Sequence, residues 1–323
     1  MIDNINWYPG HMKKTRELIA ENLRLVSAVV EVCDARIPVS SRNPVLSELT
    51  GGKPRILVLN KSDLADGAAT DAWIASYGRG DAASRDDVSR AIAMNSVTGD
   101  GVKKLVAALK PKTAKPMRAM VVGVPNSGKS SLINRLTGHR SARTGDRPGI
   151  TKGKQWLTLE NGIRLLDTPG ILWPKFEDPN VGLNLALCGS IRDEIMDVPD
   201  LALELIRSLE NLYPGALAGR FGLGKDGRDA RSDSEGKSGS EDCPNAEDKP
   251  STKDWQGAED EQGTEDWFDE SAETDSALLL MEAIARSRGC ILPGKRIDYE
   301  RTGRMLLDEF RSGKLGRITL ERA

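Results

Sequence analysis

The sequence contains little cysteine and almost no histidine, which removes two common ways of building a functional site. The four cysteines are scattered without CxxC spacing, at Cys33, Cys188, Cys243 and Cys290. The two histidines, His11 and His139, are far apart along the chain. We therefore exclude a disulfide framework and a zinc site built from cysteine and histidine, and we expect reduced thiols.

Long hydrophobic runs are also missing. No apolar stretch approaches the roughly 18 residues that a membrane-spanning helix needs. Residues 1–7 have neither the basic start nor the hydrophobic centre of a signal peptide. The sequence thus predicts a cytoplasmic protein without a membrane partner, and its 323 residues allow two domains.

The small net charge of −2 conceals an uneven distribution. Residues 225–275 contain 18 acidic and 6 basic residues, whereas the rest of the chain contains 40 basic and 30 acidic residues. The acidic stretch has almost no aliphatic side chains, so it cannot bury enough apolar surface to offset the entropy lost on ordering. We predict a disordered acidic insertion there. The basic remainder favours a polyanionic partner, and an ordinary solvated surface is the alternative.

The strongest motif is GVPNSGKSS, from Gly123 to Ser131, where an apolar run gives way to a helical pattern. Its glycines, lysine and serine stand at every required place of a phosphate-binding loop. Glycine lets backbone N–H groups and the next helix N-terminus point at an anion, while Lys129 neutralises the terminal phosphates and Ser130 ligates Mg²⁺. The residues predicted to bind a nucleoside triphosphate here are Asn126, Ser127, Gly128, Lys129, Ser130 and Ser131.

Two further loops indicate that the nucleotide carries guanine. Asn60, Lys61 and Asp63 form an NKxD motif directly after an apolar strand pattern. The Asp63 carboxylate can accept hydrogen bonds from N1 and the 2-amino group of guanine, which adenine does not offer. Asn95 and Ser96, after the next strand pattern, suit a loop that receives the guanine carbonyl oxygen, although two residues alone do not define a motif.

A second metal motif, DTPG, begins at Asp167. Asp167 is expected to reach Mg²⁺ through water, and the Gly170 N–H to contact the γ-phosphate. Thr151 is the candidate switch threonine that closes on Mg²⁺ when the γ-phosphate is present, and Thr144 is the competing candidate. These roles place Lys129, Thr151 and Gly170 in the predicted catalytic site.

Alternating apolar strands and amphipathic helices predict a parallel sheet covered on both faces. The expected strands are residues 26–32, 55–59, 91–94, 120–122, 155–159 and 163–166, and a helix is expected near 12–25. Helices alone are expected later, at 181–191, 201–213, 277–286 and 299–311. We therefore predict an α/β domain over 1–178 and a small all-α, RNA-binding domain over 179–323, which the acidic insertion at about 225–275 interrupts.

The order of the motifs is unusual. In an ordinary Ras-like domain the phosphate loop comes first and NKxD late, whereas here NKxD precedes the phosphate loop. We predict a circularly permuted Ras-like P-loop GTPase domain, because the Lys/Pro-rich segment 111–116 can join what would normally be two neighbouring termini. The chain after Gly170 then leads directly into the helical domain, so contacts with the γ-phosphate can be transmitted to it.

Together, these motifs resemble the circularly permuted GTPases of the ribosome biogenesis GTPase A type. The likeness covers nearly the whole chain: WYPGHM, DARIPVSSRNP, NKSD, GVPNSGKSSLINRL, TGDRPGITKGKQW, LLDTPGILWPKFED and the terminal helical domain. It implies a GTP-hydrolysing switch in late assembly of the large ribosomal subunit, with rRNA and ribosomal proteins as partners. The acidic segment between Gly224 and Ser276 is longer than the family leads us to expect.

The resemblance also implies two further site residues. Gly170 is followed by Ile171 and Leu172, whose apolar side chains cannot orient water, so turnover alone should be slow and stimulated by the subunit. His11 matches a family histidine that is implied to swing toward the phosphates and position the water; a helix-start or packing histidine is the alternative. Asn126 resembles the asparagine with which related GTPases coordinate K⁺ beside the phosphates.

Three readings of the function remain open from the sequence. The first is a K⁺-assisted GTPase switch that docks on pre-ribosomal RNA. The second is a GTP-sensing, RNA-binding scaffold with little turnover, and the third is a GTPase that regulates a protein or membrane partner. All three take GTP and GDP as ligands and Mg²⁺ as cofactor, and we expect a monomer.

Overall fold

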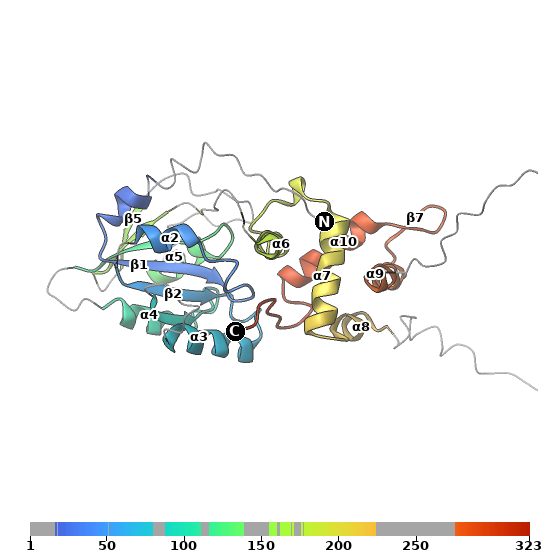
Figure 1. Cartoon of the computed structure of the whole chain (residues 1–323), viewed down its shortest axis with the longest axis horizontal. Coiled ribbons are helices and arrows are strands. Elements are labelled where there is room, and N and C mark those ends of the chain that lie inside the picture. Colours follow the sequence, from blue (N-terminus) through green and yellow to red (C-terminus); the bar gives the residue numbers. More distant parts are fainter. Residues whose placement is uncertain are drawn as a thin grey trace, which may run out of the picture.

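The structure is a computed structural model that describes residues 17, 19–50, 52–79, 88–110, 116–138, 155–159, 162–168, 170, 176, 178–223 and 275–323. Six strands form one sheet in the order β3-β2-β1-β4-β6-β5. Figure 1 labels β1, β2 and β5 of this sheet. Their bounds are β1 Ala28–Asp34, β2 Arg55–Asn60, β3 Val88–Ala93, β4 Arg118–Val122, β5 Gln155–Thr158 and β6 Arg164–Asp167. Neighbouring strands are parallel except β5 and β6, which are antiparallel.

All six strands that the sequence predicts are present, with shifted ends. β1 and β2 are buried along their whole length, which is why apolar residues, several of them β-branched, fill most of both strands. β1 begins two residues later than expected, because the Val26 N–H closes a turn on the Leu23 carbonyl instead of joining the sheet. It also continues through Asp34, so that this carboxylate stands at the carboxyl end of a central strand.

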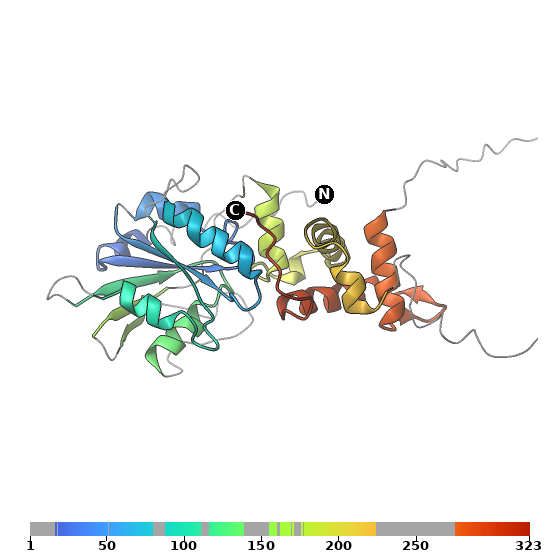
Figure 2. The same cartoon turned by 90° about the horizontal axis from the view of Figure 1, so that it is seen from below.

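Helices cover both faces of the sheet (Figure 2). On one face, α4 (Val102–Ala108) and α5 (Lys129–Thr137) pack Leu105 and Leu132 against β1, β2 and β4. On the other face lie α2 (Pro44–Leu49) and α3 (Gly67–Arg79). Of the helix expected near 12–25, Glu17 and residues 19–23 are helical, and residues 12–16 and 18 lie outside the described part.

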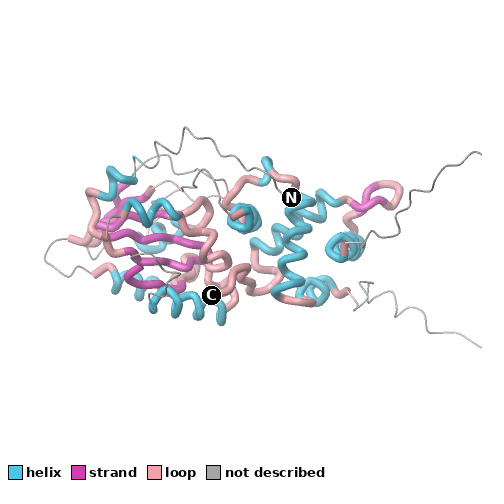
Figure 3. Tube along the Cα trace, in the orientation of Figure 1, coloured by secondary structure: helices cyan, strands magenta, loops and turns pink. Residues whose placement is uncertain are grey.

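A second unit is almost entirely helical (Figure 3). It contains α6 Pro179–Leu187, a 3-10 turn Asp193–Ile195, α7 Val198–Leu212, α8 Ala216–Phe221, α9 Ser276–Ser287 and α10 Tyr299–Arg311. An aspartate accepts a hydrogen bond from the first turn of α6, α7, α9 and α10, namely Asp178, Asp197, Asp275 and Asp298. These caps explain where the four predicted helices begin. None of the helices in the described ranges is long and apolar enough to cross a membrane.

Some short elements were not anticipated from the sequence. They are α2, α8 and a two-stranded hairpin, β7 (Ile291–Leu292) with β8 (Arg296–Ile297). Elements this short leave too few repeats for a period to be read. The acidic insertion predicted at about 225–275 falls outside the described residues except for Asp275, and the division into domains at 178/179 stays a prediction.

The two units share packing rather than standing apart. Ile37 and Val124, from loops at the edge of the sheet, belong to the same buried apolar cluster as α6, α7 and α10. The C-terminal segment returns to the sheet, where Trp73 of α3 donates its indole N–H to the Glu321 carbonyl at 3.1 Å. Figures 1 and 2 both place the C-terminus close to α3. The loops at this edge of the sheet therefore lie between the two units.

Candidate guanine nucleotide site

The phosphate loop between β4 and α5 needs glycine for steric reasons. A Cβ on Gly123 would lie 2.2 Å from the Val32 carbonyl oxygen, and one on Gly128 would lie 2.1 Å from Nδ2 of Asn60. Gly128 also has φ 93°, which L side chains rarely adopt, and it caps the N-terminus of α5. The loop thus approaches other backbone as closely as a phosphate cradle must, and the start of α5 opens into it.

Lys129 lies buried at the start of α5, and its ammonium donates to the Val124 carbonyl at 2.7 Å across the loop. Burial lowers the pKa of this ammonium to about 8, and the charge of Asp167 opposes part of that shift. A buried cation that has lost its water gains strongly from a phosphate placed beside it. The role of Lys129 at the terminal phosphates stays a prediction.

Asp167 ends β6 and is 1% exposed. Burial raises the pKa of its carboxyl to about 6, while the Lys129 charge and the Thr168 N–H act in the opposite sense. Its Oδ1 atom has no hydrogen-bond partner among the described residues. Such an oxygen fits a divalent cation, and the described residues contain no group of three acidic, cysteine or histidine ligands that could hold a metal alone. A Mg²⁺ site here would therefore combine Asp167 and Ser130 with phosphate oxygens and water.

Gly170 lies directly against the phosphate loop. A Cβ at this position would come within 2.9 Å of Pro125 Cα and 3.0 Å of Lys129 Nζ. Only a residue without a side chain lets this part of the backbone approach the loop so closely. The contact of the Gly170 N–H with a terminal phosphate stays a prediction.

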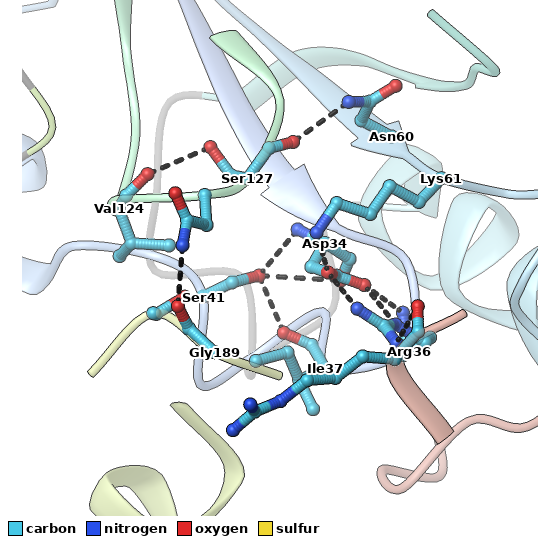
Figure 4. A network of polar contacts seen from close by, with 12 residues as sticks. Asp34, Arg36, Ile37, Ser41, Asn60, Lys61, Val124, Ser127 and Gly189 are labelled. Carbon is cyan, nitrogen blue, oxygen red and sulfur yellow. Dashed lines mark hydrogen bonds and ion pairs between the residues drawn. The ribbon is translucent and has the colours of Figure 1, made fainter. Parts of the chain in front are cut away.

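The NKxD motif contacts the phosphate loop through its asparagine (Figure 4). Asn60 donates from Nδ2 to the Ser127 carbonyl at 2.8 Å. Its Oδ1 accepts from the Ser96 N–H at 3.1 Å and the Ser96 hydroxyl at 2.7 Å. Asn60 therefore joins three predicted nucleotide loops, and its buried amide is satisfied on both sides. Asp63 is exposed at the end of the same motif, where a purine could reach it.

Asn95 shapes the third loop from within. Its Oδ1 accepts from the N–H groups of Val97 and Thr98, at 2.8 and 3.1 Å. Asn95 and Ser96 are both buried, and Arg135 of α5 donates to the Ser96 carbonyl at 3.2 Å. The structure thus places these residues in a hydrogen-bonded loop beside Asn60. Their contact with the guanine carbonyl stays a prediction.

Sequence reasoning missed a buried charge cluster beside NKxD. Asp34 accepts from Arg36 Nε at 2.9 Å and Nη2 at 2.8 Å, and its Oδ2 pairs with Lys61 Nζ at 2.8 Å (Figure 4). Burial alone would raise the pKa of Asp34, but the charges of Arg36 and Lys61 hold it well below its usual range. The position of Asp34 at the end of β1, next to the strand that ends in NKxD, could have indicated this cluster.

Other predicted residues are placed differently. Asn126, at φ 58°, donates from Nδ2 to the Gly189 carbonyl at 2.7 Å, which links the phosphate loop to the turn after α6. Ser131 lies half-buried in the first turn of α5. His11, Thr144 and Thr151 lie outside the described residues, so their catalytic and metal roles stay predictions.

Comparison with known proteins identifies the family. A profile described as 50S ribosome-binding GTPase matches residues 118–213. The match begins at β4 and leaves the NKSD sequence outside, as expected where that motif has moved ahead of the phosphate loop. Ribosome biogenesis GTPase A of Bacillus cereus is 38% identical over 330 residues, which cover 98% of this chain and 93% of the relative. Mitochondrial ribosome-associated GTPase 1 of Bos taurus is 35% identical over 241 residues, which cover 69% and 71%.

Solved structures agree with the sequence matches. GNP-bound YlqF from T. maritima has a TM-score of 0.59 and 28% identity, and the match covers 96% of this chain and 98% of that chain. Magnesium dependence is typical of such GTPases. Identity of this extent over nearly the full length shows that the chain belongs to the ribosome biogenesis GTPase A family, and its circularly permuted P-loop domain is that of a GTP-hydrolysing enzyme.

Proposed function

We propose that the protein is a GTP-hydrolysing switch that binds the immature large ribosomal subunit through rRNA and promotes its late assembly. It acts as a cytoplasmic monomer, binds the subunit in its GTP state and leaves after hydrolysis. The names of its relatives, which refer to ribosome biogenesis and ribosome association, support the choice of partner.

The main support for a switch is a direct connection between the phosphate loop and the helical unit. The phosphate loop is bonded directly to the turn after α6, through Asn126 Nδ2 to the Gly189 carbonyl at 2.7 Å and Ser190 Oγ to the Pro125 carbonyl at 2.9 Å. A ligand shifts a conformational equilibrium only through contacts that differ between the two states. A γ-phosphate against this loop changes such contacts, and the helical unit responds because it is attached there.

The helical unit offers a basic surface for rRNA. Arg288, Lys295 and Arg296 are exposed on and beside the β7–β8 hairpin, and Arg286 is exposed on α9. Clustered arginine and lysine gain affinity for polyanions by releasing counterions. We therefore assign rRNA contact to residues 179–323, with this hairpin at its centre.

Each site residue then has a role. Lys129 and the Gly170 N–H stabilise charge on the terminal phosphates, Thr151 closes on Mg²⁺ when the γ-phosphate is present, and His11 positions the attacking water. Magnesium ion, when bound by Ser130, Asp167 and Thr151, supplies neutralising charge. Asn126, whose amide nitrogen donates to the Gly189 carbonyl, coordinates K⁺ beside the phosphates.

Co-sedimentation tests the partner. The full-length protein is mixed with large ribosomal subunits or with protein-free lipid vesicles, in GDP and in a non-hydrolysable GTP analogue. We expect it to pellet with subunits only, and more with the analogue. Turnover is measured with and without subunits, and with K⁺ or Na⁺. Binding without stimulated turnover would favour the scaffold, and vesicle binding would favour a membrane partner.

His11→Ala tests the water-positioning role, and His139→Ala is the matched control because the chain has no other histidine. His11→Ala should bind GTP and subunits normally but lose about 10²-fold of the stimulated rate. It should then accumulate on the subunit in its GTP state. Wild-type stimulated turnover in this variant would reduce His11 to a structural residue.

A further inference from the structure

The C-terminal segment from Gly313 to Arg322 runs along the NKxD loop. The Ile318 N–H donates to the Leu64 carbonyl at 3.0 Å, and the Leu320 N–H donates to the Arg36 carbonyl at 2.8 Å. A Cβ on Gly313 would come within 2.7 Å of Leu64 Cδ2, so the backbone packs closely there. The end of the helical unit is therefore in contact with the loop that carries Asp63.

Arg317 makes the most specific of these contacts. Its Nη2 donates to the Ser62 carbonyl at 3.0 Å and its Nε donates to the Ala65 carbonyl at 2.8 Å. These two carbonyls flank Asp63 on either side in the sequence. The rigid guanidinium plane fixes the two carbonyls relative to each other, which a flexible single donor could not do.

Other contacts also set the course of this loop, and Arg317 adds to them from the helical unit. Lys61 adopts φ 58°, which an L residue occupies only when its surroundings impose it. The Ser62 N–H is tied to the Met94 carbonyl at 3.0 Å and the Leu64 N–H to the Lys61 carbonyl at 2.9 Å. The first bond ties the loop to the residue that follows β3, the second closes a turn within the loop, and Arg317 adds contacts from the helical unit.

We propose that Arg317 is a positioning residue for guanine recognition. By fixing the Ser62 and Ala65 carbonyls, it directs the Asp63 carboxylate toward the purine, so a residue of the helical unit completes the base specificity of the GTPase domain. The inference rests on the role of Asp63 in the proposed function. Because GTP and GDP share the guanine, Arg317 contributes equally to the binding of both.

The test measures dissociation constants of GDP, a non-hydrolysable GTP analogue and ADP for the full-length protein. Arg317→Ala should raise the constants for GDP and for the analogue by the same factor, about tenfold, because it removes two hydrogen bonds from a charged donor. The constant for ADP should stay unchanged, so the preference for guanine falls. At saturating GTP, kcat should stay within about twofold of wild type.

Two further variants separate positioning from general stability. Arg317→Lys, which can still donate to one carbonyl, should recover part of the affinity. Arg322→Ala is the matched control: Arg322 lies on the same segment, pairs with Asp66 at 3.2 Å and stacks on Tyr213, but donates to neither Ser62 nor Ala65 in the described contacts. It should leave GDP affinity unchanged while lowering Tm. If Arg317→Ala does not fold, Arg317→Gln replaces it under the same criteria.

Several results would overturn the inference. An Arg317→Ala protein with wild-type GDP affinity would do so. A much larger loss of affinity for the GTP analogue than for GDP would also do so, because it would show that Arg317 couples the γ-phosphate to the helical unit and does not position the guanine contact. Asp63→Asn in the same assay, with xanthosine diphosphate added, tests separately whether Asp63 contacts the guanine. Unchanged GDP preference in Asp63→Asn would remove the proposed guanine contact itself. If Asp63→Asn comes to prefer xanthosine diphosphate while Arg317→Ala keeps wild-type GDP affinity, only the role of Arg317 is wrong.

Discussion

Asn60 and Ser127 lie 67 positions apart in the sequence and are joined by a hydrogen bond of 2.8 Å between the Asn60 amide and the Ser127 carbonyl. The bond connects the NKxD motif to the phosphate loop. It forms because β2 and β4 flank β1 in a parallel sheet, so their carboxyl ends reach the same edge. The permutation that reverses the order of the motifs in the chain therefore leaves their meeting point intact (Figure 4).

Asn60→Ala should weaken nucleotide binding by about tenfold or more. The substitution leaves the buried Ser127 carbonyl and the buried Ser96 N–H and hydroxyl without their partner, and each buried unsatisfied group costs about 1 to 3 kcal/mol. The Kd for GDP and the thermal midpoint of the nucleotide-free protein both report the change. Asn180→Ala, an exposed position in α6, serves as the control and should change neither by much. Wild-type Kd in Asn60→Ala would contradict the structural role of this bond.

The sequence predicted the parallel sheet, its permuted order and the residues of the phosphate loop, because each rests on local periodicity or on fixed spacing. It could not predict that Asn126 bonds to Gly189 or that Arg317 holds the NKxD loop, at sequence separations of 63 and up to 255. Such contacts depend on how two separately patterned units pack together. For Asp34, the sequence was sufficient to predict a position at the end of a strand. It was not sufficient to predict the pairing of Asp34 with both Arg36 and Lys61.

Lys129→Met should abolish nucleotide binding yet stabilise the nucleotide-free protein at pH 7. Burial lowers the pKa of Lys129 from 10.5 to about 8, so below pH 8 the fold carries a buried charge that the unfolded chain keeps in water. At about 1.4 kcal/mol per pKa unit, this costs about 3 kcal/mol. Between pH 8 and 10.5 the unfolded state binds more protons than the folded state, so wild-type stability rises with pH and the difference between the proteins shrinks.

Urea unfolding from pH 7 to 10, with EDTA and without nucleotide, measures this effect. Lys104→Met is the control, because Lys104 is exposed on α4 and its charge stays in water in both states. The free energy of unfolding of Lys129→Met should exceed that of wild type at pH 7 and converge toward it at pH 10. A variant that is less stable at pH 7 would show that the bond from Lys129 to the Val124 carbonyl outweighs the cost of burial.

Deleting residues 226–274 should leave a folded protein that binds ribosomal subunits more tightly at low salt. The segment offers almost no aliphatic side chains to a core, and its net negative charge competes with RNA for basic surfaces. Asp275 is kept because its Oδ1 accepts from the Ala277 N–H at the start of α9, and its other oxygen pairs with Arg207. The slope of log affinity against log salt should steepen. A control with a Gly–Ser linker of the original length separates charge from tether length, and weaker subunit binding by the deletion would contradict the model of competition.

Gly170→Ala should impair GTP-state contacts while sparing GDP binding. A Cβ at this position would lie 2.9 Å from Pro125 Cα and 3.0 Å from Lys129 Nζ, so the backbone must move away from the phosphate loop by a few tenths of an ångström. If the Gly170 N–H donates to the γ-phosphate, that movement weakens a bond which only GTP makes, and turnover should fall by about tenfold or more. The ratio of Kd for the non-hydrolysable analogue to Kd for GDP should rise by a similar factor.

Gly78→Ala on α3, where a Cβ meets nothing within 4 Å, is the matched control and should leave both quantities unchanged. Equal losses of GDP and analogue binding in Gly170→Ala would instead show that the alanine distorts the phosphate loop as a whole. GDP has no γ-phosphate, so it cannot lose a hydrogen bond from the Gly170 N–H.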